Sequence, residues 1–261
     1  MGVVLRELVK RALPDSLILR IGERKRSEST LVCRFSIGRT QLAEDFSTDP
    51  IVSALRRLMS RPARPIEELA FELTEAFCAI RAHPKMTVGQ LYGIRRPSLD
   101  YPLWARVAPW EEITPAQRYR RTPDSARRDR KKHGLSLSRR EVISALETPT
   151  RAAMYSQASQ YARLVQSIRE NGAQLDWEPL PLVWLLTDGA SLRWVLGSGG
   201  NHRSRIYAAM GLESFLGRVQ GLVDVRQVDS WHCVRSGVFS RDEAVGIFWQ
   251  YLNAVPFLAR D

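Results

Sequence analysis

The sequence has few cysteines. Three occur among 261 residues, Cys33, Cys78 and Cys233, and none belongs to a CxxC pair. An odd number of cysteines at this spacing predicts neither a disulfide framework nor a zinc site, and we expect no structural metal. A reducing cytoplasm is the simplest compartment for such a chain.

Long apolar runs and targeting signals are also missing. No uninterrupted apolar stretch approaches the roughly 18–20 residues that span a bilayer. The opening stretch MGVVLRELVKRALPDSLILRI is too charged for a signal peptide and lacks a small-residue cleavage site. Its spacing predicts an amphipathic helix broken at Pro14, whose apolar face comprises Val4, Leu5, Leu8, Val9 and Leu13.

Two common nucleotide-binding signatures are absent. The chain contains no GxxxxGK[ST] loop, and its glycine-rich stretch 197-GSGG-200 does not continue as GxGxxG. There is no long internal repeat and no low-complexity tract. With 44% hydrophobic residues, the composition is that of a folded protein.

Positive charge is in surplus and is concentrated in the first part of the chain. The formal net charge is +11, and residues 1–150 hold 28 Lys and Arg against 18 Asp and Glu. This distribution predicts a surface for a polyanion such as nucleic acid, an acidic glycan or anionic lipid, although a solvated basic face without a partner explains it equally well. The densest cluster supplies eight candidate contacts: Arg118, Arg120, Arg121, Arg127, Arg128, Arg130, Lys131 and Lys132.

Hydrophobic periodicity predicts the main elements. Helices are expected over 50–60, 65–82 and 150–172, and a final helix is expected to begin at a capping box of Ser240 and Glu243. Strands are expected near 31–35, over 103–107, at 182–186 and 193–196 on either side of an Asp188-Gly189 turn, and over 215–225. Residues 83–124 otherwise read as irregular, except for a turn and the start of a helix after 103–107 in 101-YPLWARVAPWEEITPAQ-117.

The stretch 197-GSGGNHRSRIYAAMG-211 predicts a strand that turns sharply into a helix. The first amides of a helix have no partner within it, and the helix dipole adds positive charge there, so such an end attracts anions. Arg203 could hold phosphate oxygens with two N–H groups, and His202 could donate a hydrogen bond or a proton. We interpret the stretch as a phosphate-binding turn; a purely structural turn is the alternative. The helix is expected to bury Ile206, Ala209 and Met210.

An ordered set of motifs resembles the ParB/sulfiredoxin superfamily. The matching pieces are 103-LWARVAPWEEITP-115, 167-SIRENG-172, 179-PLPLVW-184, 188-DG-189, 199-GGNHR-203 and 208-AAMGLE-213. The resemblance covers about residues 103–225 and is interrupted by a long basic insertion.

The resemblance implies an α/β (α+β) fold: a compact ParB/sulfiredoxin-like mixed-sheet domain with flanking helices. We expect this domain at 101–225, with the basic insertion at about 116–148. A basic, mainly helical region is expected at 1–100, and helices at 226–261 are expected to pack on the domain.

By the same resemblance, the nucleotide's phosphates would contact six residues: Ser167, Gly199, Gly200, Asn201, His202 and Arg203. Sulfiredoxins have GGCHR, whose cysteine is the nucleophile, so Asn201 excludes sulfinate reduction by that route. Gln160 and Ser167 stand where sulfiredoxins carry a lysine and a threonine. Only one of the arginine pair of partition-type ParB proteins remains, and no helix-turn-helix follows.

These features favour a nucleotide-binding protein, either an ATP-dependent phosphotransferase (kinase) or an NTPase. Its expected cofactor is ATP or another NTP, Mg²⁺ is a possible second cofactor, and the acceptor is not identified. The candidate catalytic residues are His202 and Glu170, since this chemistry needs phosphate clamps and a carboxylate base. The alternative is a DNA-associated protein of ParB or nuclease type that binds through 118–132. Tyr119, Trp104 and Trp110 would then stack on bases. A third possibility is docking of the N-terminal helix on an anionic membrane surface.

Overall fold

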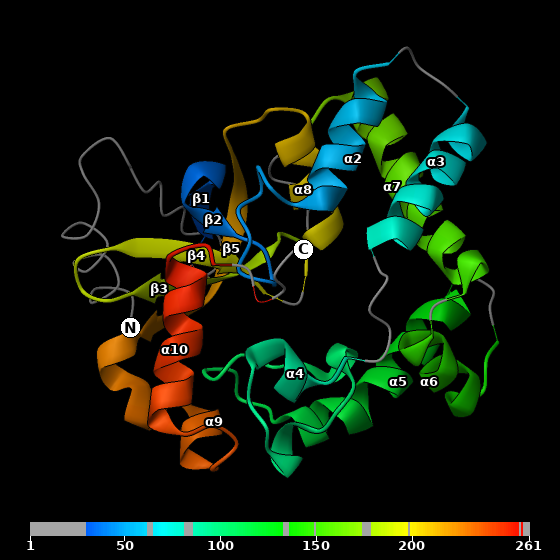
Figure 1. Ribbon diagram of the computed structural model, residues 1–261. Coiled ribbons are helices and arrows are strands. Elements are labelled where there is room, and N and C mark those ends of the chain that lie inside the picture. The colour runs from blue at the N-terminus through cyan, green and yellow to red at the C-terminus, as the bar shows by residue number, and fades with distance from the viewer. Residues whose placement is uncertain are drawn as a thin grey trace.

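The computed structural model describes residues 30–61, 65–80, 86–132, 136–148, 150–173, 179–197, 199–255 and 257. They form a mixed α/β structure around one five-stranded sheet, in which the strand order is β1-β5-β3-β4-β2 (Figure 1). The strands are β1 (Thr30–Arg34), β2 (Gly38–Arg39), β3 (Leu182–Thr187), β4 (Leu192–Leu196) and β5 (Ser214–Asp224). The expected mixed α/β class is therefore confirmed.

Alternation along the strands separates two hydrophobic cores. Val183 and Leu185 of β3 point into one core, whereas Leu186 lies in the other, because successive side chains of a strand face opposite sides. Trp194 and its neighbour Val195 on β4 divide in the same way. The centre of the sheet is thus buried on both faces, which explains its nearly continuous apolar sequence.

Four helices contribute to the first core: α2 (Pro50–Met59), α3 (Ile66–Ile80), α7 (Arg151–Asn171) and α8 (Asn201–Ala209) (Figure 1). α8 packs against β5, α2 and α7 pack on α8, and α3 packs on α2 and α7. Asp49 caps α2 by accepting hydrogen bonds from the amides of Ile51 and Val52. α7 ends at Gly172, whose φ of 77° is the left-handed conformation that glycine adopts without strain. The predictions for α2, α3 and α7 are confirmed.

The second face is covered by α10 (Arg241–Leu252), η4 (Val225–Ser230) and α9 (His232–Arg235) together with the segment before α5. That segment contains α4 (Val88–Tyr92) and the 3₁₀ helices η2 (Pro97–Leu99) and η3 (Leu103–Ala105). The first 3₁₀ helix, η1 (Phe35–Ile37), lies between β1 and β2. The predicted capping box of Ser240 and Glu243 is present at the start of α10.

Two further helices carry the basic segment: α5 (Pro115–Lys132) and α6 (Arg139–Glu147), which pack together. The helix start expected within 101–117 is confirmed, because α5 begins at Pro115. The irregular structure expected elsewhere in 83–124 was wrong for 88–92, which form α4. A capping box of Ser138 and Glu141 begins α6.

The strand expected over 103–107 is also wrong. Leu103, Ala105 and Val107 alternate with polar or larger residues as in a strand, but Leu103–Ala105 is a short 3₁₀ helix held by the Ala105 amide on the Pro102 carbonyl. The place beside β4 is taken by β2, which pairs with it in parallel.

Strands from before residue 100, in the expected N-terminal region 1–100, join the sheet of the expected 101–225 domain. β1 and β2 belong to the same sheet as β3, β4 and β5, and α2 packs on α8. Met210, expected inside, is 37% exposed just after α8. The helix predicted at the N-terminus lies outside the described residues. Within the described residues, no helix is both long and apolar enough to cross a membrane.

Candidate functional site

The glycine-led turn joins β4 to α8 at one end of the sheet. Gly200 is the N-cap of α8, has φ 81° and provides no side-chain cap. By contrast, a side chain caps each of α2, α4, α6, α7 and α10. Residues 199–203 are all half-exposed, so the positive end of α8 is accessible from solvent.

Only some of the glycines have a packing reason. A Cβ on Gly200 would lie 2.3 Å from Cβ of Pro181, and one on Gly197 would lie 2.7 Å from Oε1 of Gln220. A Cβ on Gly199 would meet only Cγ of Leu182, at 3.8 Å. Gly199 is therefore the glycine of this turn whose small size the fold does not require.

The first turn of α8 places three predicted residues together. The ring of His202 packs edge-on against Tyr161 of α7, with the centroids 4.4 Å apart. Nη1 of Arg203 donates to the Pro179 carbonyl at 3.3 Å. Oδ1 of Asn201 is buried and accepts no hydrogen bond from the described residues.

A buried ion pair anchors α8. Nε of Arg205 lies 2.8 Å from Oδ2 of Asp49, whose side chain is 1% exposed. Burial works against the charge of Arg205, but the Asp49 carboxylate and the Tyr161 hydroxyl outweigh it and raise the pKa of the guanidinium. The carboxylate that caps α2 thus also fixes the position of the helix that follows the turn.

The candidates on α7 lie further from the turn. Glu170 follows Tyr161, the contact of His202, by nine residues, which corresponds to about 13.5 Å along the helix and about 180° around it. Glu170 is exposed and accepts a hydrogen bond from Gln166 at 2.7 Å. Ser167 is half-exposed and lies between these positions along α7. The structure brings Gly199, Gly200, Asn201, His202 and Arg203 together but does not bring Glu170 to them.

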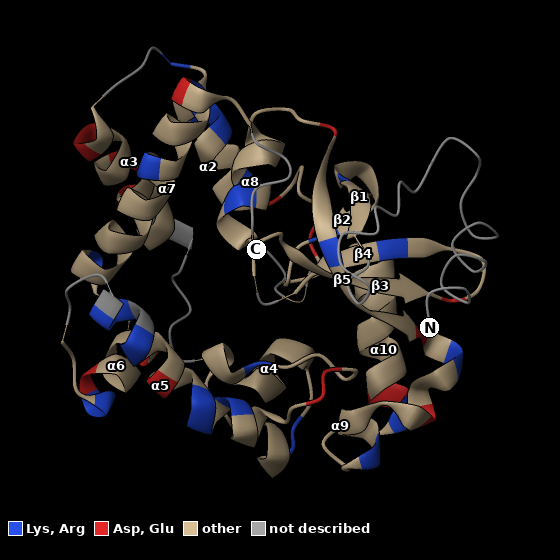
Figure 2. Cartoon of the chain, turned by 180° about the vertical axis from the view of Figure 1, so that it is seen from behind, with Lys and Arg blue, Asp and Glu red and all other residues tan. Residues whose placement is uncertain are grey.

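The basic cluster lies on α5, where the ribbon at Lys and Arg positions is blue in Figure 2. At about 100° per residue, five of its exposed cations fall within about 120° of one another around the helix. They are Arg120, Arg121, Arg127, Arg128 and Lys131. Arg130 is half-buried, and Lys132 is the last residue of the helix.

Arg118 differs from the rest of that cluster because protein groups hold its guanidinium. Nη1 donates to the Arg106 carbonyl at 2.9 Å, and Nη2 pairs with the Glu111 carboxylate. Trp104 and Tyr119 stack on each other, with ring centroids 5.0 Å apart. Trp110, the third expected stacking residue, is only 6% exposed and packs in the second core.

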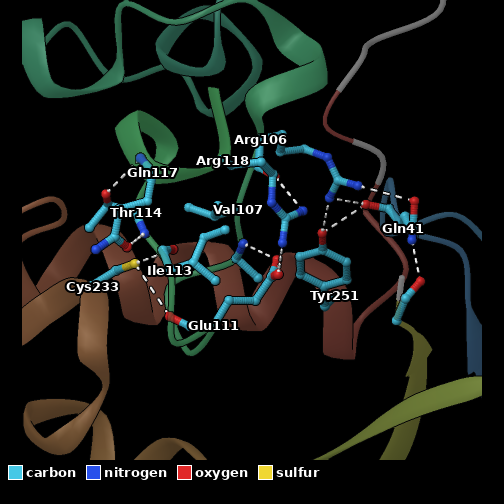
Figure 3. A network of polar contacts seen from close by, with 12 residues as sticks. Gln41, Arg106, Val107, Glu111, Ile113, Thr114, Gln117, Arg118, Cys233 and Tyr251 are labelled. Atoms are coloured by element: carbon cyan, nitrogen blue, oxygen red, sulfur yellow. Dashed lines mark hydrogen bonds and ion pairs between the residues drawn. The ribbon is translucent and has the colours of Figure 1, made fainter. Parts of the chain in front are cut away.

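A polar network connects this region to the glycine turn (Figure 3). The side-chain amide of Gln41 donates to the Gly197 carbonyl. Nη1 of Arg106 donates to the Gln41 carbonyl at 2.5 Å and to the Tyr251 hydroxyl at 3.0 Å. Burial raises the pKa of Tyr251, so its hydroxyl stays protonated and donates to the Gln41 carbonyl at 2.8 Å.

Beside this network lies a cavity of about 350 Å³. Its wall includes Leu196 and Gly197, the residues that lead into the glycine turn. The charged lining residues are Arg106, Arg118, Glu111 and Glu112. Trp184 and Val195 line it from the second face of the sheet. The cavity therefore lies on the opposite face from the core that α8 covers.

Sequence reasoning missed most of this cavity. Arg106 lies in 103–107, which the sequence predicts as a strand, and Glu111 lies just after it; the charged residues of 103-LWARVAPWEEITP-115 were the available signal. Gln41 and Tyr251 are separated by 210 residues, and no local pattern relates them.

No protein-family model matches the chain, and neither a curated protein nor a solved structure is significantly similar to it. Among the described residues, no group of three or more His, Cys, Asp and Glu is arranged to hold a metal ion.

Proposed function

We propose that the chain is a nucleotide-binding protein of ParB/sulfiredoxin-like type that transfers a phosphoryl group from ATP or another NTP to an acceptor. The observation that carries this proposal is the accessible, glycine-led N-terminus of α8, which has no side-chain cap and has Arg203 in its first turn. Helix ends of this kind bind phosphate through their amides and dipole.

The glycines give the proposal a second support. Gly197 and Gly200 are explained by close packing against Leu182 and Pro181, but Gly199 is not. Absence of a side chain at Gly199 lets a phosphate approach the backbone closely.

Nucleotide binding is tested by thermal unfolding with ATP, CTP and ADP, each with and without Mg²⁺. A nucleotide at about 100 times its Kd stabilises the folded state by about 2.7 kcal/mol. For a chain of this size that corresponds to a rise in Tm of roughly 5–10 °C. Absence of a shift with every nucleotide would refute the proposal.

Arg203→Ala locates the site. Loss of a charge-assisted hydrogen bond worth about 1.5–3 kcal/mol weakens binding roughly 10- to 100-fold. Arg139→Ala is the matched control, because Arg139 also donates to a backbone carbonyl, that of Arg120, but lies on α6. If both variants bind the nucleotide as the parent does, Arg203 is not part of the pocket.

A second candidate function is binding of DNA, in the manner of ParB-like or nuclease-type proteins, through the exposed face of α5. The observation that favours it is the alignment of five exposed cations within about one third of the helix circumference. From Arg120 to Lys131 the stripe is about 16.5 Å long, along which duplex DNA presents a charge every 1.7 Å or so.

A salt titration separates this candidate from the first. Removing two phosphate contacts with Arg127→Gln and Arg128→Gln reduces the slope of log K against log salt concentration by about 1.8. The control is Arg56→Gln with Arg57→Gln, another adjacent pair of exposed arginines, near the end of α2. A slope that is flat, or that both pairs reduce equally, would exclude binding by α5.

A further inference from the structure

The cavity beside Gly197 has an evenly balanced charge. Two arginines, Arg106 and Arg118, line it together with two glutamates, Glu111 and Glu112. Such a wall suits a neutral ligand, because an anion or a cation would face as many like charges as opposite ones.

Its remaining wall combines amides and aromatic rings. Gln41 and Gln220 offer donors and acceptors, while Trp110, Trp184 and Tyr251 offer apolar surface. Aromatic rings with a small number of polar groups are the usual lining of a small-molecule site.

The volume also limits the ligand. Pockets for drug-sized molecules range from about 300 to 1,000 Å³, and this cavity of about 350 Å³ is at the small end. It suits a molecule of monosaccharide size rather than a whole nucleoside triphosphate.

The two glutamate carboxylates of the cavity differ in their interaction partners. Glu111 accepts a hydrogen bond from the Ala108 amide at 2.8 Å and pairs with Arg118, so its charge is neutralised. Glu112 is exposed, and neither an ion pair nor a hydrogen bond engages its carboxylate within the described part of the chain. Glu112 is thus available to accept a proton from a bound hydroxyl group.

We propose that this cavity is the acceptor site of the phosphotransferase, that it binds a neutral polyhydroxylated molecule such as a sugar or a cyclic polyol, and that Glu112 is its general base. This inference rests on the proposed function. The acceptor's hydroxyl oxygen bonds to the γ-phosphorus as the bond from that phosphorus to the β,γ-bridging oxygen breaks. The electron pair of the broken bond leaves with the nucleoside diphosphate, and the hydroxyl proton passes to Glu112 and then to water.

The binding part is tested without nucleotide. Saturation-transfer NMR on the full chain uses D-glucose, D-ribose and myo-inositol, with glucose 6-phosphate and gluconate as charged counterparts. At least one neutral compound is expected to receive saturation from the protein, and Gln220→Ala is expected to weaken its binding about tenfold. Failure of all three neutral compounds at tens of millimolar, or stronger binding of the charged ones, overturns the inference.

The chemical part uses formation of the diphosphate from ATP and Mg²⁺ in the presence of the polyol that binds. Glu112→Gln is expected to lower the polyol-dependent rate about 10²- to 10⁴-fold while the affinity for ATP stays unchanged. Glu147→Gln, at an exposed glutamate near the end of α6, is the control and keeps the parent rate.

The outcomes distinguish the two proposals. Binding of a polyol without any binding of nucleotide would leave the cavity as a polyol site and remove the phosphotransferase. Binding of ATP that Gln220→Ala weakens tenfold would show that the cavity holds the nucleoside, which overturns the acceptor site but keeps the proposed function. An unchanged rate in Glu112→Gln would remove Glu112 as the base.

Discussion

Alanine substitutions at three glycines separate what the fold requires from what a ligand requires. At Gly200 an added Cβ would lie 2.3 Å from Cβ and 2.5 Å from Cα of Pro181, and φ is +81°. A left-handed non-glycine residue costs about 1–2 kcal/mol, and overpacking adds about 1–3 kcal/mol. Gly200→Ala should therefore lower the free energy of unfolding by about 2–5 kcal/mol.

Gly237 isolates the backbone contribution, because its φ is +72° and an added Cβ would meet nothing within 4 Å. Gly237→Ala should lower the free energy of unfolding by only about 1–2 kcal/mol. At Gly199 the added Cβ would make an ordinary contact at 3.8 Å, and φ is outside the left-handed region. Gly199→Ala should be neutral, or stabilise by up to about 1 kcal/mol through the unfolded state.

Urea unfolding followed by tryptophan fluorescence measures all three. The expected order of stability is Gly199→Ala above Gly237→Ala above Gly200→Ala, with unchanged m-values. If Gly199→Ala loses more than about 1 kcal/mol, or if Gly200→Ala is no worse than Gly237→Ala, the packing argument is wrong. Because Gly199→Ala keeps the fold, a tenfold loss of nucleotide affinity in this variant would result from the added methyl group crowding the phosphates and not from lost stability.

Three further predictions concern the rest of the molecule. Asp49→Ala should lower the free energy of unfolding by about 3–5 kcal/mol, because it leaves a buried arginine unpaired; urea unfolding would contradict this if the loss were under about 1 kcal/mol. Hydrogen bonds from the Arg226 guanidinium hold the pKa of Asp224 below its ordinary value of 3.8. The ionised Asp224 carboxylate therefore stabilises the fold fully above pH 3.8, and this stabilisation is lost as the pH falls through the lowered pKa. Below about pH 4, the urea midpoint of unfolding should consequently fall less in Asp224→Asn than in the parent protein. Burial raises the pKa of the Cys33 thiol, and raises that of Cys233 to about 12. Iodoacetamide at about pH 8 should thus label Cys78 first, as mass spectrometry of the native protein can check.

Local patterns in the sequence were sufficient where a helix or turn depends on nearby residues. The Asp188-Gly189 hairpin, the stop at Gly172 and the capping box at Ser240 each involve groups within a few positions of one another. Their hydrogen bonds form wherever the rest of the chain lies, so the residue types alone predict them.

The edge of the sheet and the cavity were beyond such reasoning. β2 has only two residues, and its pairing with β4 depends on Gly38, where a Cβ would lie 2.1 Å from the ring of Trp194. The contact of Gln41 with Gly197 spans 156 residues. Periodicity describes the exposure of one segment and carries no information on which distant segment it meets.

The error at 103–107 shows how the site came to be overlooked. Read as a strand, the segment would have placed Arg106 in a ladder, with its side chain facing either core or solvent. As a 3₁₀ turn it instead directs the Arg106 guanidinium to Gln41 and Tyr251, and its carbonyl to Arg118. The same change of backbone brings the segment beside Gly197, where the end of β4 leads into the glycine turn. A polar cavity therefore lies at Leu196 and Gly197, at the end of β4, because this segment does not pair with the sheet. The acceptor proposed for that cavity depends on this departure from the expected fold.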